Sequence, residues 1–336
     1  YGKTFDAENV LLELQKSVEL EYDKAENKPK KIIGDLLPAI LDKMKATDHA
    51  QMLQYAQALG SALTTKDIQV WFRNADEQAE VAKMQWDGAL SPVVGDTLAL
   101  NEANIGGQKT DAVSDEQVTH DIAIQSDGSI IDTLTLVRRH SGLSGELFHG
   151  ANNVAYVRAY APQGSILLSA TGLQPPPPSA YKKPLEEDPM DEDVLLQEQG
   201  AQIDPSGIRV TQEFGRTAFG GWAQLGPGRV SETVYRYKLP FTAFELAERL
   251  RAAGSPTTDA GPSSQRAAYL LSLISQSGKT DRGLTIRLQV PKEWKLTWTN
   301  QDWQERNGIR ELVIPAWDRD HAIALVFGPL HDDLRC

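Results

Sequence analysis

The spacing of apolar residues changes its period near residue 65, and this change limits the possible folds more than any other feature. Before it, apolar residues recur every three to four positions, within Val10–Val18, Ile32–Met44 and Met52–Leu63. This period predicts amphipathic helices, with Asp6 and Asp48 as N-caps. After residue 65, apolar and polar residues alternate, as in strands whose side chains point to opposite faces. The chain is therefore predicted to be α+β.

The composition shifts along the chain divide it into three parts. Residues 1–90 are predicted to form the helical part of an α/β domain, packed on a few strands and incomplete at its N-terminus. Residues 91–240 are predicted to form a β-sandwich of immunoglobulin-like type, interrupted at 173–202 by a proline-rich, acidic, solvated excursion. Residues 241–336 contain a helix at 243–251, a flexible loop at 253–265 and final strands that complete or extend the β region.

Three local patterns make more specific predictions. Val118–Val137 alternates on both sides of Asp127-Gly128, which predicts a hairpin. The alternation in Ile68–Phe72 predicts a strand, and Asp76–Met84 is expected to form a short helix. Three consecutive polar residues, Arg138 to His140, follow the hairpin. Because neighbouring strand residues face opposite ways, these three are predicted to lie on a solvated strand edge.

Charge and hydropathy exclude some classes of protein. The chain has 336 residues, is 40% hydrophobic and carries a net charge of −12, which argues against nucleic-acid binding because phosphates require clustered lysine and arginine. Its apolar runs fall short of the roughly 20 residues that cross a bilayer. The chain starts at Tyr1 in what reads as the end of a strand, so we expect upstream sequence, including any membrane anchor. The single cysteine, Cys336, excludes an internal disulfide and is interpreted as incidental.

Catalytic motifs were sought and not found in the sequence. It contains no phosphate-binding loop, dinucleotide fingerprint, nucleophile elbow or His-Glu-x-x-His zinc motif. The six histidines are scattered along the chain without the short spacing of paired metal ligands. These observations favour a non-catalytic protein, with no catalytic residues and no cofactor.

The most site-like cluster is a polar turn between two predicted strands. Adjacent glycines can present backbone N–H groups to an anion, and a neighbouring lysine can add charge. The alternative is that the glycines only permit the turn and that the asparagines satisfy its backbone, which we favour. The candidate ligand-binding residues are Asn101, Asn104, Gly106, Gly107, Lys109 and Asp111.

Two further groups of residues could bind ligands. The late tryptophans Trp294, Trp298 and Trp303 could stack on sugar rings, although large aromatic residues more often fill sandwich cores. The acidic excursion contains Asp188, Asp191 and Asp193, a weak calcium candidate that lacks the glycine and distal glutamate of an EF-hand loop. A solvated loop is the favoured interpretation, so no metal site is predicted.

Several short segments, in this order and spacing, together resemble a family of bacterial membrane-anchored envelope proteins. The family is classified as domain of unknown function number four thousand and twelve, and the resemblance covers nearly the whole chain. The matching segments are Ala7–Val10, Lys66–Phe72, Gln85–Gly88, Asn104–Asp111, Tyr156–Arg158, Pro162–Ser165, Phe219–Trp222, Pro227–Gly228 and Tyr237–Pro240.

The resemblance implies a place in the cell and a set of partners. It implies an extracytoplasmic protein at the cell surface or envelope, held to the membrane only by an N-terminal helix upstream of the given sequence. Its partners would be a wall polymer or another envelope protein, and association into a homo-oligomer is also compatible. Adhesion, assembly or wall-polymer binding is the expected function.

Two alternatives stay open. The family's N-terminal part is distantly similar to the LytR-CpsA-Psr ligases that attach glycopolymers to the wall, so the chain could be part of a glycopolymer phosphotransferase. The ligase residues that bind lipid pyrophosphate have no matching positions here. The other alternative is a carbohydrate-binding β-sandwich module that uses the late tryptophans.

Overall fold

The computed structural model describes residues 1–22, 24, 26–90, 92–183, 185–254 and 266–329. The chain divides after Leu63 into two compact units, Tyr1–Leu63 (unit 1) and Thr64–Cys336 (unit 2). Residues 64–90, which the sequence groups with the helices, therefore belong to the β-rich unit. The loop 253–265 and Cys336 lie largely or wholly outside the described residues.

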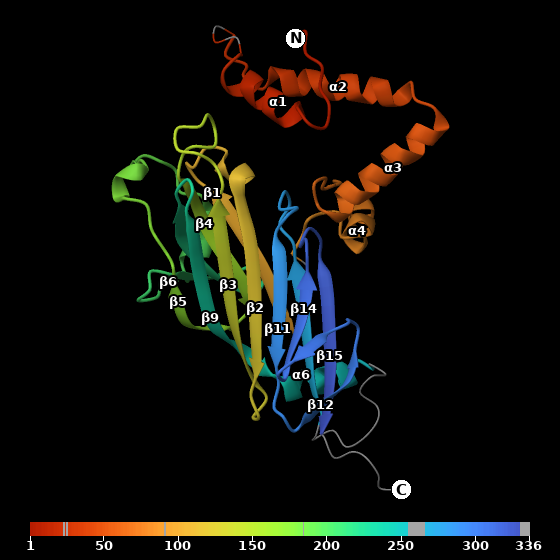
Figure 1. Ribbon diagram of the computed structural model, residues 1–336, viewed down its shortest axis with the longest axis vertical. Helices are drawn as coiled ribbons and strands as arrows, with labels where there is room; N and C mark the ends of the chain where they lie inside the picture. Colours follow the sequence, from red (N-terminus) through yellow and green to blue (C-terminus); the bar gives the residue numbers. More distant parts are fainter. Residues whose placement is uncertain (23, 25, 91, 184, 255–265, 330–336) are drawn as a thin grey trace. The chain divides into compact units, whose positions relative to one another are not determined.

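Unit 1 is helical, as the sequence period predicts. Its helices are α1 (Val10–Glu19), α2 (Lys31–Lys45) and α3 (His49–Thr64), and α1 packs against α2 (Figure 1). Asp48 caps α3 by accepting the Gln51 N–H at 2.9 Å, as expected. Asp6 instead accepts the Glu8 and Asn9 N–H groups in the turn before α1, which begins only at Val10.

The apolar stripe of α2 is only partly buried. Ile32 is buried, whereas Ile33, Leu37, Ile40 and Leu41 are exposed. No helix among the described residues is long and apolar enough to cross a membrane.

Unit 2 begins with an irregular segment and a short helix, α4 (Ala75–Lys83). The helix confirms the prediction for 76–84, and Asn74 caps it by accepting two backbone N–H groups. The predicted strand at 68–72 is wrong, because these residues form no β-ladder. Isolated hydrogen bonds hold the segment instead. The Val70 N–H donates to the Trp86 carbonyl at 2.9 Å, and the Phe72 N–H donates to the Gln78 side chain at 2.9 Å.

The remaining elements of unit 2 form two mixed sheets, so the α+β class is confirmed (Figure 1). In the described residues, sheet A has the strand order β12-β15-β10-β1-β4-β8-β7-β6 and sheet B the order β13-β14-β11-β2-β3-β9-β5. The strands of sheet A are β1 (Asp96–Asn104), β4 (Asn153–Pro162), β6 (Gln202–Ile203), β7 (Arg209–Glu213), β8 (Arg216–Leu225), β10 (Ala267–Ile274), β12 (Trp294–Thr299) and β15 (His321–Pro329). Those of sheet B are β2 (Ser114–Ile124), β3 (Ser129–His140), β5 (Ile166–Thr171), β9 (Val230–Thr242), β11 (Gly283–Gln289), β13 (Gln304–Arg306) and β14 (Ile309–Ile314).

The pairing of strands confirms the hairpin and reveals how the sheets extend. β2 and β3 pair antiparallel around the Asp127-Gly128 turn. Two pairs are parallel, β1 with β10 and β2 with β11. They join the strands of residues 96–242 to those of residues 267–329, so both parts contribute to the same two sheets.

One hydrophobic core receives side chains from both sheets. Leu98, Val157 and Phe219 come from sheet A, and Ile122 and Tyr237 from sheet B. The rings of Phe219 and Tyr237 lie 5.4 Å apart between the sheets. Helix α6 (Ala243–Ala252) begins with a capping box and adds core residues next to β10.

The excursion at 173–202 is largely exposed, and it contains the short helices η2 (Pro178–Ala180) and α5 (Glu192–Glu198). Tyr181 anchors it, since its ring stacks on Trp222 at 5.5 Å and its hydroxyl donates to the Ile105 carbonyl. A further short helix, η1 (Thr110–Val113), precedes β2.

Candidate functional site

A cavity of about 500 Å³ lies on the face of sheet A that points away from the core. Cross-strand partners Asn101 of β1 and Arg158 of β4 share this outer face. The irregular segment at the start of unit 2 contributes Lys66, Gln69, Gly88 and Leu90 to the lining, and the turn after β10 contributes Ser275, Gln276 and Ser277. Several segments that carry the family resemblance therefore meet at one cavity.

One ion pair and two hydrogen bonds connect the walls of this cavity. Lys66 is buried, and its Nζ lies 2.7 Å from Oδ1 of Asp320, which also accepts the Ser275 N–H at 2.8 Å. The Ser277 hydroxyl donates to the Lys66 carbonyl at 2.8 Å. These contacts fix the irregular segment over the sheet, so the cavity keeps its shape without a strand at 68–72.

Arg158 is the polar side chain best placed to meet a ligand. Its side chain is 32% exposed, and Nη1 lies 3.4 Å from Oε2 of Glu213. The Tyr160 hydroxyl donates to the same carboxylate at 2.9 Å, and burial raises the pKa of Tyr160 to about 12, so the donor persists at neutral pH. Nε of Arg158 has no hydrogen-bond partner among the described residues. That atom is buried, so it is the exposed part of the guanidinium that can donate to a ligand hydroxyl or carbonyl.

The predicted polar turn is held together by its own side chains. Asn104 accepts the Gly107 N–H at 2.9 Å and donates to the Gln108 carbonyl and to Thr110. A Cβ on Gly107 would lie 2.3 Å from Asn104 Oδ1 and 2.8 Å from the Val154 nitrogen, so only glycine fits there. Asp111 accepts from Asn153 at 2.7 Å. Of the six predicted residues, Asn101 lines the cavity, while Lys109 and Gly106 are exposed elsewhere.

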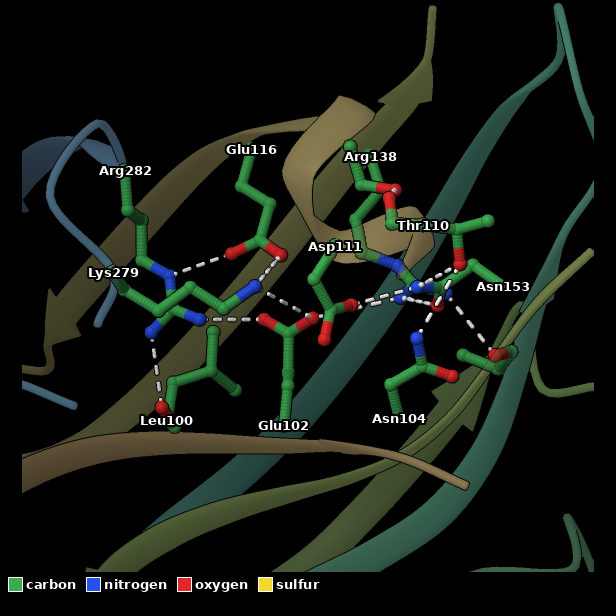
Figure 2. A network of polar contacts seen from close by, with 12 residues as sticks. Leu100, Glu102, Asn104, Thr110, Asp111, Glu116, Arg138, Asn153, Lys279 and Arg282 are labelled. Atoms are coloured by element: carbon green, nitrogen blue, oxygen red, sulfur yellow. Dashed lines mark hydrogen bonds and ion pairs between the residues drawn. The ribbon is translucent and has the colours of Figure 1, made fainter. Parts of the chain in front are cut away.

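Next to this turn lies a network of buried charges between the two sheets (Figure 2). Arg282 donates to Glu116 at 2.8 Å, to Glu102 at 2.6 Å and to the Leu100 carbonyl at 2.9 Å. Lys279 pairs with Glu116 and lies 3.9 Å from Glu102. Arg138 lies 3.5 Å from Glu102 and donates to Asn153 at 2.9 Å. Three cations and two carboxylates therefore pair with one another between the sheets, where both arginines and both glutamates are buried and the Lys279 side chain is 12% exposed.

This network corrects the prediction of a solvated edge at Arg138 to His140. Arg138 and His140 are each 1% exposed, and only Arg139 faces solvent. β3 lies between β2 and β9 and so is not an edge strand. Alternation correctly separates the side chains onto two faces, but the sequence does not show which face the sheets enclose.

The pKa values of Glu102 and Glu116 are shifted in opposite directions. Burial and the charge of Glu116 raise the pKa of Glu102 to about 7, against the attraction of Arg282. Burial also raises the pKa of Glu116, but Arg282 and Lys279 outweigh it and lower that pKa to about 2. These shifts describe a stabilising network with one strongly ionised member.

The fall of the unfolding free energy at acid pH should depend on protonation of Glu116. Its pKa is lower in the folded state than the ordinary 4.5, so folded protein binds fewer protons and stability falls as pH drops below 4.5. Glu102 is protonated in both states below that pH. The difference in unfolding free energy between wild type and Glu116→Gln should shrink by about 2 kcal/mol from pH 4.5 to pH 3. Urea denaturation measures it, and a constant difference would contradict the assignment.

The late tryptophans do not form one stacking platform. Trp294 packs against Phe244 and Phe327, with ring centres 5.3 and 6.1 Å apart. Trp303 is partly buried against the core, whereas Trp298 is exposed. Stacking on a sugar by all three together is not supported, and core packing accounts for Trp294 and Trp303.

The three candidate calcium ligands serve the loop itself. Asp191 caps α5 by accepting the Val194 N–H at 3.0 Å, and Asp188 accepts the Leu185 N–H at 2.8 Å. Asp193 is exposed in the first turn of α5. Within the described residues, the carboxylates of the excursion do not converge as a metal-binding group.

The sequence reasoning missed the buried charged residues, although a signal for them was present. In β2, Glu116 and His120 alternate in phase with apolar Val118 and Ile122. In β3, Asp132 and Arg138 alternate in phase with apolar residues in the same way. A charged residue on the apolar face of a strand predicts a buried partner.

Comparisons with known proteins leave this site without an assigned ligand. No protein-family model and no curated protein matches the chain. Among solved structures, an M1 zinc metallopeptidase from Deinococcus radiodurans is similar at 12% identity and a TM-score of 0.26, over 72% of this chain and 45% of that one. A Legionella pneumophila protein described as nutrient-binding is similar at 6% identity and a TM-score of 0.34, over 70% and 72% of the two chains. The chain thus spans less than half of the metallopeptidase.

Proposed function

We propose that this protein is a non-catalytic, extracytoplasmic bacterial envelope protein that binds the glycan part of a wall polymer in the cavity on sheet A. The observation that carries the proposal is the cavity itself, which is lined by Asn101, Gln276 and Ser277 together with the partly exposed Arg158. Amides, hydroxyls and a guanidinium bind sugar hydroxyl and acetamido groups through hydrogen bonds. The resemblance to the envelope family supports the location.

The charges of the site support binding over catalysis. Both cations that line the cavity are paired, Lys66 with Asp320 and Arg158 with Glu213. The buried glutamates Glu102 and Glu116 are saturated by Arg282 and Lys279 and do not line this cavity. A net charge of −12 also favours an uncharged glycan strand over a phosphate-rich polymer.

The architecture that we infer for unit 2 is a β-sandwich of two joined antiparallel modules. Its support is the core shared by both sheets and the strand pairing, in which, as far as the structure describes the chain, only β1·β10 and β2·β11 are parallel. Both parallel pairs connect residues 96–242 with residues 267–329, so pairs within each module are antiparallel, as in immunoglobulin-like folds. Solution measurements that placed the two sheets apart would contradict it.

Calorimetric titration with soluble, uncharged glycan strands, oligosaccharides of β-1,4-linked N-acetylglucosamine, tests the binding site. We expect the wild type to bind and Arg158→Gln to bind about tenfold to hundredfold more weakly, since a hydrogen bond from a charged group is lost. Lys109→Ala is the matched control: it also removes one exposed positive charge, but outside the cavity, and should bind like the wild type.

Two outcomes would overturn the proposal. Flat titrations of the folded wild type with the glycan strands would exclude glycan binding. Equal affinity of Arg158→Gln and wild type would place the binding elsewhere on the protein. A parallel titration with a phosphodiester-linked wall polymer is expected to give weaker binding, and tighter binding there would identify an anionic ligand instead.

A further inference from the structure

Inside the core lies a second group of titratable side chains, separate from the cavity. Asp96 of β1, His120 of β2 and Asp132 of β3 are each 0% exposed. One ligand atom from each can be chosen so that all three lie within 4.8 Å of one another. Asp96 belongs to sheet A, and His120 and Asp132 to sheet B, so the group lies between the two sheets.

The register of the strands explains why these side chains meet. In the β2·β3 ladder, His120 is opposite Leu134 and Asp132 is opposite Ile122, so the two polar residues are diagonal neighbours on the core face. Their Nε2 and Oδ2 atoms are 3.5 Å apart. The hydroxyl of Tyr237, from β9, lies 3.4 Å from the same Nε2.

The contacts within the structure leave part of this group unsatisfied. Asp96 accepts the Thr97 N–H at 2.7 Å and the hydroxyl of Tyr269. In contrast, among the described residues neither carboxylate oxygen of Asp132 accepts a hydrogen bond of normal geometry, although Asp96 and Tyr237 lie near it, and Nδ1 of His120 has no partner either. Buried carboxylate oxygens without a donor are costly, so they indicate a cation that completes the site.

The balance of charge in this group also indicates a bound cation. Among the described residues, neither Asp96 nor Asp132 forms an ion pair with lysine or arginine. Two ionised carboxylates and a neutral imidazole would leave two negative charges in the core, each costing several kcal/mol of desolvation. One divalent cation cancels both charges.

We propose that Asp96, His120 and Asp132 bind one divalent transition-metal ion, of the Zn²⁺ type, that fastens sheet A to sheet B. One nitrogen and two carboxylate oxygens are a ligand set that zinc accepts, and the 3.5 Å separation of two ligand atoms is close to the edge of a zinc tetrahedron, about 3.3 Å. Calcium requires six to eight oxygen ligands and does not fit this group. Complete burial of all three ligands keeps bulk solvent away from the ion, and a fourth position of the tetrahedron stays open for a buried water.

Metal analysis of the full chain tests this proposal. The protein is unfolded with chelator, refolded with or without Zn²⁺, dialysed, and measured by mass spectrometry for bound zinc and by calorimetry for the melting temperature. We expect about one zinc ion per chain and a higher melting temperature for the zinc-refolded protein. Refolding with Co²⁺ should give the visible absorption bands of a tetrahedral site.

The variants separate this site from adventitious binding. Asp132→Asn keeps the shape of the side chain and should lose nearly all bound zinc, while Asp193→Asn, which removes an exposed carboxylate of the excursion, should bind like the wild type.

The proposal fails if zinc-refolded wild type contains no zinc, or if Asp132→Asn retains it. The first result would show that Asp96 and Asp132 share a proton instead. If Asp132→Asn does not fold, the test uses the wild type alone. Equal melting temperatures of wild type refolded with and without Zn²⁺ would then overturn the proposal. Neither result depends on glycan binding by the cavity.

Discussion

Arg282→Met should destabilise unit 2 by about 3–5 kcal/mol. Arg282 is 1% exposed and donates to both buried glutamates and to the Leu100 carbonyl. Its removal leaves two carboxylates in the core with only Lys279 and Arg138 to balance them. Because the variant leaves buried acceptors of Glu102, Glu116 and Leu100 without these charge-assisted hydrogen bonds, the loss exceeds that of a surface pair. Urea denaturation followed by circular dichroism measures it.

Arg287→Met is the matched control for this prediction. Arg287 lies in β11 and pairs with Glu311 at 3.0 Å, but its side chain is 46% exposed. Solvent screens such a pair, so the variant should lose less than about 1 kcal/mol. Equal losses for the two variants would show that the network of Figure 2 contributes no more than a surface ion pair.

Trp317→Ala should cost about 3–5 kcal/mol through the cavity that it creates. Trp317 is 1% exposed, and its ring lies 5.8 Å from the Arg282 guanidinium, while its backbone N–H, which the variant keeps, donates to the Arg282 carbonyl at 2.7 Å. The substitution therefore removes core packing and support for the charge network together. Thermal and urea unfolding of the purified variant measure the loss.

Trp298→Ala provides the comparison, since Trp298 is 42% exposed on the same stretch of late tryptophans. An exposed substitution of this kind should change stability by less than about 0.5 kcal/mol. If Trp298→Ala were as damaging as Trp317→Ala, the assignment of Trp317 as the core tryptophan would be wrong. Because Trp317 contacts Arg282, the effects of Trp317→Ala and Arg282→Met should not add.

The elements that the sequence predicts correctly are those set by local patterns. The helices of unit 1, α4, α6 and the β2–β3 hairpin follow from residues within one or two turns of each other. The strand predicted at Ile68–Phe72 is absent because alternation of apolar and polar residues alone does not create a strand. A strand needs a partner edge, and here the backbone bonds to Trp86 and Gln78 instead.

The candidate site was predicted less completely than the fold. Asn101 lines the cavity as a member of the predicted turn, but its neighbours Asn104 and Gly107 only stabilise that turn. Arg158 and Gln276 lie far from Asn101 in the sequence, and strand pairing brings Arg158 beside it. No local pattern shows which distant segments meet on one face of a sheet.

By itself, the sequence determined the two kinds of secondary structure and the change between them near residue 65, because the period of apolar residues acts over a few positions. The tertiary structure alone decided that Arg138 and His120 are buried and that Asp96 meets Asp132. It also decided that the segment at 66–90 closes a cavity over β1 and β4. These outcomes depend on pairings between residues more than 30 positions apart, whose contacts only the assembled sheets bring together.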